Sequence, residues 1–375
     1  MNNNAELPGG IIRYFAIYGD FEWVKPFGSG HINATFQSQW NQAGVKLRYT
    51  HQRINDRVFI RPDEVMENIE RVTNHIRENL DSQDGHPDNS RRVLTVVPSR
   101  EGKLWVRDGE GGWWRTYLFI DGCHTLEICS TENEARLLGE SIALFQSRLA
   151  GLGAPRLHET IPGFHDMEKR YARFYEALSN DCFNRAKETK AEIGFMKANE
   201  ERGAILIRSV RNGSIPERVC HNDCKINNIL IDDKSGEALC VIDLDTVMTG
   251  TVLFDFGDLV RTVCGRAAED ERDLSKVEFD TAFFRSLLEG YLSHGKSFLL
   301  APELALLCEA GRNLCQIMSL RFLTDYLEGD HYYRTARPGH NLDRCRSQIA
   351  LIESMDSKWK EAEAIVKKLC QPDCF

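Results

Sequence analysis

The spacing of the apolar residues changes along this chain, and the change constrains the fold more than any other feature. Up to about residue 60, stretches such as INATFQSQW alternate apolar and polar residues, which predicts strands with one buried face. From Pro62 onward the apolar residues recur every three or four positions, which predicts a helix. Its buried face comprises Val65, Ile69, Val72, Ile76 and Leu80. Strands followed by helices indicate an α+β fold.

Further strands are predicted on both sides of this helix. WVKPF leads into a tight turn at Gly28-Ser29-Gly30, and NQAG predicts the hairpin turn before VKLRYTHQRI. After the polar loop DSQDGHPDNS, the stretches RRVLTVVPS, GKLWVRD and WWRTYLFID predict three more strands. The chain is therefore expected to be rich in strands to about residue 120.

Helical patterns dominate from there on. Thr131 and Glu134 form a capping-box pattern at the start of a helix that Gly151 is expected to end. Its apolar face comprises Ala135, Leu138, Ile142, Phe145 and Leu149. Residues 165–210 and 270–369 are also predicted to be largely helical, and between them NILI and ALCVIDL predict a hairpin around the turn DDKSGE.

We therefore expect an N-terminal extension over residues 1–20, a strand-rich unit with one helix over 21–120 and a helix-rich unit over 121–375. The net charge of −9 argues against nucleic acid as a partner. The start MNNNAELPGG lacks the apolar core of a signal peptide, and no stretch reaches the roughly 18 apolar residues of a membrane span. The 12 cysteines are scattered, which indicates reduced thiols in a cytoplasmic protein, with Cys370 and Cys374 as the expected exception.

The densest polar cluster is CHNDCKINNIL, which starts at Cys220. Cys220, His221 and Cys224 offer three zinc-type ligands, but a structural zinc site needs a fourth, and Cys240 stands alone in an apolar strand. Nothing nearby in the sequence is expected to lower the pKa of a cysteine, so a Cys/His nucleophile pair is no better supported. The spacing of the other polar residues is more informative.

The order His221-x-Asp223-x-Lys225-x-x-Asn228 has the spacing of the protein-kinase catalytic loop. In that loop the aspartate accepts the proton of the attacking hydroxyl, and the asparagine binds Mg²⁺. We expect His221 to support the loop and Lys225 to stabilise the transferring phosphoryl group. The full set in this order favours phosphoryl transfer over an ordinary turn.

A second metal-binding aspartate should follow on a strand. Asp243 does so in VIDLD, and Asp245 would point to the same side if the strand continues. The triplet Asp255-Phe256-Gly257 spells a further kinase motif, but it follows a loop glycine, Gly250, and not a predicted strand. We expect Asp255 and Asp258 to brace the loop through hydrogen bonds to the backbone or to an arginine such as Arg261.

A kinase also needs a cover over the phosphates. Gly28-Ser29-Gly30 is a candidate, because the backbone amides of glycines can approach phosphate closely, although a plain hairpin turn is the simple alternative. Ser29, His31 and Asn33 are candidates for additional hydrogen bonds.

The phosphates also need a cation. Lys46 lies too early in its strand, whereas Arg53 lies at the strand end, so we assign the phosphate contact to Arg53. Its acidic partner should lie on the helix that begins at Pro62, where Glu67 and Glu70 are both available, and Glu67 is preferred. A solvated helix face is the alternative for either glutamate.

Several stretches resemble the bacterial N-acetylhexosamine 1-kinases of the aminoglycoside phosphotransferase and choline kinase superfamily. They are GSGHINATF, HQRIN, MENIERV, CHNDCKINNIL, VIDLDTVMTG, FDFGDLVR and LRFLTDYLEGDHYY, and they cover nearly the whole chain in the expected order. The resemblance implies a bilobal protein-kinase-like fold with a nucleotide-binding N-lobe and a helical C-lobe. It also implies that ATP with Mg²⁺ phosphorylates the anomeric hydroxyl of N-acetylglucosamine or N-acetylgalactosamine.

The resemblance assigns roles to individual residues. Asp223 would be the base, and Asn228 and Asp243 would bind Mg²⁺. Arg321 and Tyr332 look like the sugar-contacting arginine and tyrosine, and His31 is a further candidate for the substrate. From the residues alone, Arg321 lies in an apolar helical run and needs either a ligand or a salt-bridge partner.

Two other functions fit the same motifs. A kinase acting on an amino alcohol or an aminoglycoside would call for a carboxylate-rich acceptor pocket, whereas a neutral amido sugar calls for arginine and aromatic contacts. A non-catalytic pseudokinase would suit Arg53 at the strand-lysine position, but intact Asp223, Asn228 and Asp243 oppose it. Asn222 replaces the arginine of the kinase triplet, so we expect no control by activation-loop phosphorylation.

Overall fold

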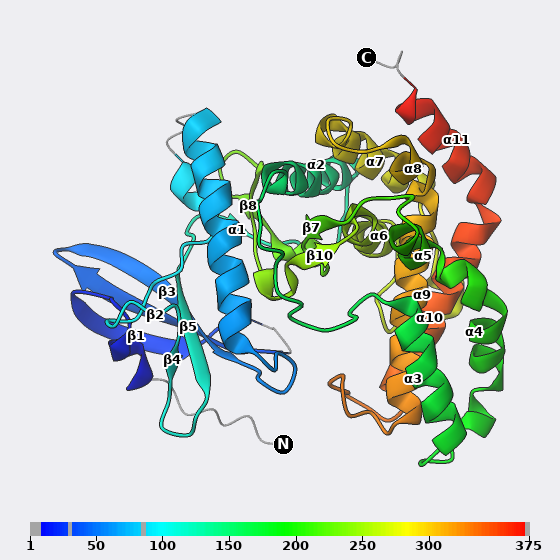
Figure 1. The fold of residues 1–375 in the computed structure, drawn as a ribbon, viewed down its shortest axis with the longest axis horizontal. Coiled ribbons are helices and arrows are strands. Elements are labelled where there is room, and N and C mark those ends of the chain that lie inside the picture. The colour runs from blue at the N-terminus through cyan, green and yellow to red at the C-terminus, as the bar shows by residue number, and fades with distance from the viewer. Residues whose placement is uncertain (1–8, 29–31, 84–87, 372–375) are drawn as a thin grey trace. The chain divides into compact units, whose positions relative to one another are not determined.

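This computed structural model describes residues 9–28, 32–83 and 88–371. Strands and helices are both present, which confirms the predicted α+β class (Figure 1). The chain divides into two compact units, each assembled from segments that are distant in the sequence. The N-terminal unit comprises residues 1–124, 151–162 and 230–248. The C-terminal unit comprises residues 125–150, 163–229 and 249–375.

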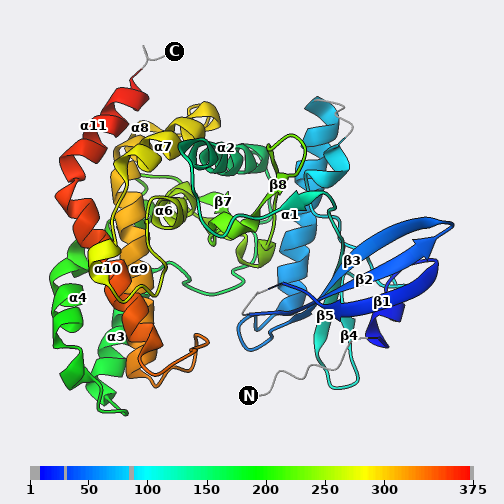
Figure 2. The ribbon, with the colours of Figure 1, turned by 180° about the vertical axis from the view of Figure 1, so that it is seen from behind.

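An antiparallel five-stranded sheet forms much of the N-terminal unit, with the strand order β1-β2-β3-β5-β4 (Figure 2). Its strands are β1 (Asp20–Pro26), β2 (Ala34–Gln42), β3 (Val45–Ile54), β4 (Val106–Arg107) and β5 (Trp113–Leu118). The predicted hairpin turn joins β2 to β3. Ala43 and Gly44 both have positive φ, 52° and 91°, which matches the twist of the flanking strands.

Segments before and after the first three strands of the sheet contribute buried residues to this unit. Ile12, Phe15 and Ile17, from the predicted N-terminal extension, are buried in one cluster with residues of β2, β3 and β5. After the sheet strand β3 comes α1 (Pro62–Gln83). All five apolar residues predicted for its face, from Val65 to Leu80, are at most 4% exposed, so this helix prediction is confirmed.

A second sheet in the N-terminal unit has the order β6-β8-β9. Its strands are β6 (Cys123–His124), β8 (Ile229–Asp232) and β9 (Ala238–Val241). The last two form the predicted hairpin, and β6 pairs with β8 in antiparallel fashion. Arg91 Nη1 donates to Asp232 Oδ2 at 2.8 Å. This bond connects the start of the hairpin turn to the short helix Asn89–Arg91.

The strand predicted over residues 91–99 is wrong. A 3₁₀ helix covers Asn89–Arg91, and in the rest of the range the structure contains isolated bridges but no strand. Pro98 has no N–H to donate to a ladder. The segment still follows β5, because Val97 N–H donates to Thr116 O at 2.8 Å.

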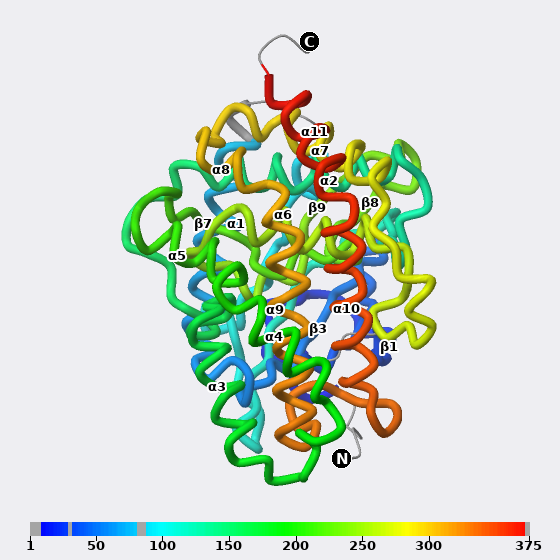
Figure 3. The backbone as a smooth tube through the Cα atoms, turned by 90° about the vertical axis from the view of Figure 1, so that its right-hand side faces the viewer, coloured from blue at the N-terminus to red at the C-terminus, as the bar shows by residue number. Residues whose placement is uncertain are grey.

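Helices make up most of the C-terminal unit. They are α2 (Glu132–Leu149), α3 (Met167–Asn180), α4 (Lys190–Gly203), α5 (Ile205–Arg211), α6 (Val252–Val263), α7 (Thr281–Gly295), α8 (Ala301–Ala305), α9 (Leu307–Leu327), α10 (His340–Ser357) and α11 (Trp359–Cys370). The long helix α9 packs against α3, α6 and α10, and Figure 3 shows α10 running beside it. This arrangement confirms that residues 165–210 and 270–369 are largely helical.

The predicted capping box of α2 is present. Thr131 Oγ1 accepts from Glu134 N–H, and the Glu134 carboxylate accepts from Thr131 N–H, both at 3.2 Å. Gly151, with a φ of 83°, follows the end of the helix as predicted. None of the helices in the described part of the chain has the length and apolar character that crossing a membrane requires.

Candidate active site

The predicted catalytic loop follows β7 (Arg218–Cys220) in the C-terminal unit. His221 is fully buried and packs edge-on against Phe145, with ring centroids 5.9 Å apart. Its Nδ1 accepts a hydrogen bond from Asp223 N–H at 3.2 Å. His221 therefore supports the loop backbone, in agreement with its predicted role.

Asp255, in the first turn of α6, holds the same loop by accepting hydrogen bonds from its backbone amides. Asp255 accepts the N–H groups of His221 (3.0 Å) and Asn222 (2.7 Å), and Gln146 Nε2 donates to it at 2.9 Å. Burial raises the pKa of Asp255, while these donors favour its charged form. Asp255 thus braces the loop as predicted, and it does so from within a helix.

Other buried groups complete this support. Asp258 pairs with Arg261 at 2.8 Å, which was also predicted. His165 Nε2 donates to Asn222 O at 2.7 Å, and burial lowers the pKa of His165 to about 3. Gly250 was expected in a loop but is the last residue of β10 (Met248–Gly250), where a Cβ would lie 2.8 Å from Asn222 Oδ1.

Asp223 is held beside a lysine. Lys225 Nζ lies 3.0 Å from Asp223 Oδ2, and the Asp223 side chain is 27% exposed. Burial favours the protonated acid, but the charge and the hydrogen bond of Lys225 outweigh burial and hold the pKa of Asp223 below its ordinary value. A carboxylate that stays ionised at neutral pH and is open to solvent can accept a proton from a substrate.

Asn228 is oriented by the loop itself. Its Nδ2 donates to Asp223 O at 2.8 Å, and its N–H donates to Lys225 O at 2.9 Å. Because the amide nitrogen makes this bond, the amide oxygen points elsewhere and is the atom available to a metal ion. Amide and carboxylate oxygens are the donors that Mg²⁺ prefers, so the predicted pair of Asn228 and Asp243 fits this ion chemically.

The cysteines of the loop do not take part in this chemistry. Cys220 and Cys224 are buried, and burial raises the pKa of both thiols well above the ordinary value, so neither is a nucleophile. Within residues 9–28, 32–83 and 88–371, no three His, Cys, Asp or Glu side chains gather into a metal-binding cluster. Cys370 carries a free thiol, and Cys374 lies outside the described residues.

The segment after β9 differs from its prediction. The strand ends at Val241, Asp243 has a left-handed φ of 61°, and a 3₁₀ helix follows over Leu244–Thr246. The expectation that Asp243 and Asp245 share one side of a continuing strand is therefore wrong. A left-handed aspartate is a strained conformation that a chain keeps where the surroundings impose it, and such positions concentrate at functional sites.

Asp245 is a structural residue of the N-terminal unit. It forms an ion pair with Arg115 of β5, and the two side chains are 4% and 1% exposed. Arg115 Nε donates to Gln52 Oε1 at 2.9 Å, and Asn33 Nδ2 donates to Asp245 Oδ2 at 2.6 Å. Burial opposes the charge of Arg115, but the carboxylate of Asp245 raises its pKa. The turn that contains Asp243 is therefore attached to the five-stranded sheet by this buried pair.

The expected pairing of Arg53 with Glu67 is wrong. Arg53 pairs with Asp108 (3.6 Å) and Glu110 (3.5 Å), because β3 lies next to β5 and the β4–β5 turn supplies both carboxylates. Glu67 is about half exposed and lies 3.0 Å from His158 Nε2. Contact of either residue with a nucleotide stays a prediction.

The predicted phosphate cover is described only at its first residue. Gly28 follows β1 with a φ of 78°, a conformation that glycine adopts readily. Ser29, Gly30 and His31 lie outside the described residues. Their predicted contacts with nucleotide or substrate therefore stay predictions.

A pocket in the C-terminal unit brings Arg321 and Tyr332 together. It is lined by Arg170, Arg173, Arg321, Thr324, Asp325, Glu328, Tyr332 and Tyr333. The Arg321 guanidinium lies 5.6 Å from the centre of the Tyr332 ring and 3.4 Å from its hydroxyl. Burial opposes the charge of Arg321, but the two tyrosines and Asp223 raise its pKa, so the pocket lies within electrostatic reach of Asp223.

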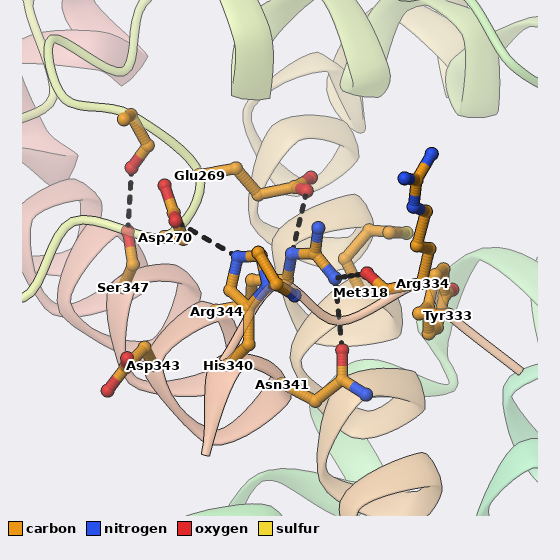
Figure 4. A network of polar contacts seen from close by, with 12 residues as sticks. Glu269, Asp270, Met318, Tyr333, Arg334, His340, Asn341, Asp343, Arg344 and Ser347 are labelled. Atoms are coloured by element: carbon orange, nitrogen blue, oxygen red, sulfur yellow. Dashed lines mark hydrogen bonds and ion pairs between the residues drawn. The ribbon is translucent and has the colours of Figure 1, made fainter. Parts of the chain in front are cut away.

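The segment that carries the two tyrosines is anchored to α10 (Figure 4). Arg344 of α10 lies 3.7 Å from Glu269 and donates to Asn341 Oδ1 (3.1 Å) and to Arg334 O (3.3 Å). Asn341 Nδ2 in turn donates to Asp325 Oδ2 at 2.8 Å. This network holds one wall of the pocket in place.

Comparison with known proteins identifies the family. The model of the phosphotransferase enzyme family matches residues 23–296, which is more than half of the chain. The chain belongs to the phosphotransferase enzyme family. A kinase-like protein of Caenorhabditis elegans, itself named as uncharacterized, is 27% identical over 185 residues. That alignment covers 44% of this family member and 47% of the relative, so the chain spans about half the length of the relative that it matches.

Solved structures show the same fold. An aminoglycoside phosphotransferase from Alicyclobacillus acidocaldarius is 12% identical, with 98% of each chain covered and a TM-score of 0.60. An ethanolamine kinase from Plasmodium vivax is 13% identical, with 90% of this chain and 84% of that chain covered and a TM-score of 0.58. A spectinomycin phosphotransferase, solved with ADP and spectinomycin, is 12% identical, with 94% of each chain covered and a TM-score of 0.50. These similarities confirm the protein-kinase-like fold.

Sequence reasoning missed three residues of this phosphotransferase. Arg115 was visible as a lone charge inside the apolar stretch WWRTYLF, where a buried cation requires a partner. Arg170 and Arg173 gave no such signal, because arginines spaced along an amphipathic helix are ordinary surface residues. Only the packing of α3 beside α9 brings them to the pocket.

Proposed function

We propose that this protein is an ATP- and Mg²⁺-dependent kinase that phosphorylates a small molecule, an N-acetylhexosamine, on its anomeric hydroxyl. Membership of the phosphotransferase enzyme family supports phosphoryl transfer. The observation that carries the choice of acceptor is the pocket beside α9, in which Arg321 and Tyr332 lie together within electrostatic reach of Asp223. The ADP bound to the similar spectinomycin phosphotransferase supports an adenine nucleotide as the donor.

Asp223 is the proposed base. It orients the sugar hydroxyl and accepts its proton while the oxygen attacks the γ-phosphorus of ATP in line with the leaving ADP. The new bond joins the sugar oxygen to phosphorus, and the bond from phosphorus to ADP breaks. A hemiacetal hydroxyl is more acidic than an ordinary alcohol, so an aspartate of lowered pKa is still an adequate base.

Charge neutralisation falls to other residues of the loop. Lys225 is proposed to stabilise the transferring phosphoryl group. Asn228 and Asp243 are proposed Mg²⁺ ligands, and Mg²⁺ bound with ATP would lower the repulsion between the phosphate oxygens and the nucleophile. Further proposed nucleotide contacts are Gly28, Ser29, Gly30, Arg53 and Glu67.

Two rival functions are less well supported. A cationic amino alcohol or aminoglycoside would meet three arginines in the acceptor pocket against two carboxylates, and both carboxylates already have partners. A pseudokinase would not need an ionised Asp223 paired to Lys225 beside a pocket. The amido sugar fits the arginine and tyrosine contacts best.

The test is an ADP-release assay over a panel of N-acetylhexosamines, hexoses, choline and aminoglycosides, with phosphorus NMR to locate the phosphate in the product. We expect turnover with N-acetylhexosamines and a 1-phosphate product. ADP release with choline or aminoglycosides alone would establish the rival acceptor class, and no release with any acceptor would contradict the proposed activity.

Asp223→Asn tests the base directly. A positioned base contributes about 10²–10⁴-fold to the rate, so kcat should fall by that factor. The Kd for ADP, measured by calorimetry, should stay unchanged, because the substitution is isosteric and Asp223 contacts the acceptor. Asp56→Asn, at an exposed position of the N-terminal unit, is the matched control and should keep full activity. Full turnover in Asp223→Asn would remove this residue from the mechanism.

A further inference from the structure

The pocket beside α9 contains more positive charge than its own carboxylates neutralise. Three guanidinium groups, those of Arg170, Arg173 and Arg321, face two carboxylates, those of Asp325 and Glu328. The imbalance is of interest because a neutral sugar needs hydrogen bonds and no net charge from its site.

Both carboxylates are engaged within the protein. Glu328 accepts two hydrogen bonds from Arg173, Nε to Oε1 at 3.0 Å and Nη2 to Oε2 at 2.6 Å. Asp325 is 3% exposed and accepts the backbone N–H groups of three consecutive residues. These are His331 (2.9 Å), Tyr332 (2.7 Å) and Tyr333 (3.0 Å). Neither acid is therefore left to neutralise another arginine.

Arg170 and Arg321 have no acidic partner within ion-pairing distance among the described residues. Arg170 donates Nε and Nη2 to Phe164 O, at 3.2 and 2.8 Å. The Arg321 guanidinium lies near the rings of Phe164 (4.8 Å) and Tyr333 (5.4 Å). Its Nη1 and Nη2 make only long contacts with neutral acceptors, Met318 Sδ (3.5 Å) and the Tyr332 hydroxyl (3.4 Å). The buried Tyr333 hydroxyl has no hydrogen-bond partner in the part of the chain that the structure describes.

Holding two half-buried cations close together costs free energy unless an anion neutralises them. Burial and the charge of Arg321 lower the pKa of Arg170 to about 10, which shows that the repulsion is felt. A guanidinium edge matches a carboxylate or a phosphate group in a bidentate manner. The unpaired donors of both arginines and the Tyr333 hydroxyl together suit one such group.

We propose that Arg170 and Arg321 bind an anionic group of the acceptor, so that the preferred substrate is an acidic amino sugar derivative, an N-acetylhexosamine that carries a carboxylate or a phosphate away from its anomeric hydroxyl. This rests on the proposed function for the reacting hydroxyl and narrows its substrate class. Asp223, whose charge acts on Arg321, would then take the proton at one end of the sugar while the arginines hold the anion at the other.

The chemistry alone does not separate an anionic acceptor from the phosphates of the nucleotide. The two sources differ in when the anion binds. An acceptor anion requires Arg170 and Arg321 for acceptor affinity only, whereas a nucleotide phosphate requires them for ADP and ATP affinity in the absence of any sugar.

The test compares matched acceptors with the wild-type protein. N-acetylglucosamine is neutral, its 6-phosphate and its 3-O-lactyl ether are acidic, and glucosamine is cationic. A charge-assisted hydrogen-bond pair of about 1.5–3 kcal/mol corresponds to about 10–150-fold, so kcat/KM for an acidic sugar should exceed that for the neutral sugar by this factor. Equal use of both sugars, or preference for the neutral one, would overturn the inference while leaving the proposed function standing.

Substitutions of the two pocket arginines test whether they bind the anionic group of the acceptor. Arg170→Gln and Arg321→Gln should bring the acidic-to-neutral ratio of kcat/KM close to one and leave the Kd for ADP unchanged. Arg334→Gln removes an exposed arginine from the same segment and should keep the wild-type ratio. A loss of ADP affinity in the two pocket variants would show that the arginines bind the nucleotide phosphates, and it would contradict the proposal.

A binding measurement keeps the two proposals distinguishable. If no sugar is phosphorylated, the proposed function fails, but calorimetry with the 6-phosphate sugar still decides whether the pocket binds an anion. Binding to the wild type that Arg321→Gln weakens by at least about tenfold, with circular dichroism unchanged, supports the anion site. No binding of either acidic sugar to the folded wild type would overturn it.

Discussion

At the scale of single residues, the proposed base depends on a lysine two positions further along the chain. Asp223 is half-buried, and burial alone would favour its protonated form. Lys225 reverses that preference from 3.0 Å away. The Asp223–Lys225 pair therefore favours the ionised carboxylate, an effect that the kinase spacing alone does not reveal.

This coupling predicts a pH dependence. With Lys225 present the pKa of Asp223 lies below its ordinary value, so activity that needs the carboxylate should persist as pH falls through the usual range of an aspartate and be lost only below that range. In Lys225→Gln burial meets less opposition, so the pKa of Asp223 should rise and the acidic limb of kcat/KM should move to higher pH, in addition to a fall in kcat. Lys234→Gln, in an exposed turn, is the control and should leave the limb in place.

An acidic limb at the same pH in Lys225→Gln and the wild type would show that another group sets the ionisation of Asp223. The same pH series monitored by circular dichroism separates loss of activity from loss of fold, since the ionised Asp223 also contributes stability that disappears as pH falls through its folded pKa.

At the scale of elements, an amide and not an acid fixes α1 to its unit. Asn68 is fully buried, and its Nδ2 donates to His158 O (2.9 Å) and Val247 O (3.1 Å). Its Oδ1 accepts from His158 N–H at 3.0 Å. Glu67, the neighbour that the kinase template favoured, faces outward.

We expect Asn68→Ala to destabilise the N-terminal unit by about 2–4 kcal/mol, because three buried backbone groups lose their partner. Glu67→Ala changes an exposed position and should shift the free energy of unfolding by no more than about 0.5 kcal/mol. Urea denaturation followed by circular dichroism measures both. A larger loss in Glu67→Ala than in Asn68→Ala would return the glutamate to a structural role.

Predictions of helices succeeded where the spacing of the apolar residues defines one buried face. The periods of α1 and α2 are intrinsic to their sequences, and burial of the predicted faces follows from them. The range 91–99 failed because strand formation depends on a partner ladder, and Pro98 limits what that segment can donate. The prediction that the strand continues past Asp243 also failed, because the backbone is left-handed at Asp243 and the next acid, Asp245, pairs with a distant residue, Arg115.

At the scale of the whole molecule, both units are assembled from separated segments. Residues 151–162 and 230–248 belong to the N-terminal unit although helical segments precede and separate them. Membership of a unit therefore does not follow the order of the sequence.

We expect ADP with Mg²⁺ to raise the Tm, because a ligand that binds the folded state stabilises it by about 2.7 kcal/mol at 100 times its Kd. EDTA should remove the metal-dependent part of the shift. Asp243→Asn should lack that same part, since its carboxylate is the proposed ligand, whereas Asp233→Asn, in an exposed turn, should keep it. A metal-dependent shift of wild-type size in Asp243→Asn would exclude Asp243 as a ligand.

The sequence by itself determined the α+β class, the two best-patterned helices and the order of the catalytic loop, because these depend on local periodicity and spacing. The support of that loop by Asp255 and His221, and the pairing of Asp258 with Arg261, were also predicted from residue type and position. Which charges of distant segments meet depended on the tertiary structure. It paired Arg115 with Asp245, separated Arg53 from Glu67, and brought Arg170 to Arg321, because ion pairs between distant segments depend on packing that no local pattern encodes.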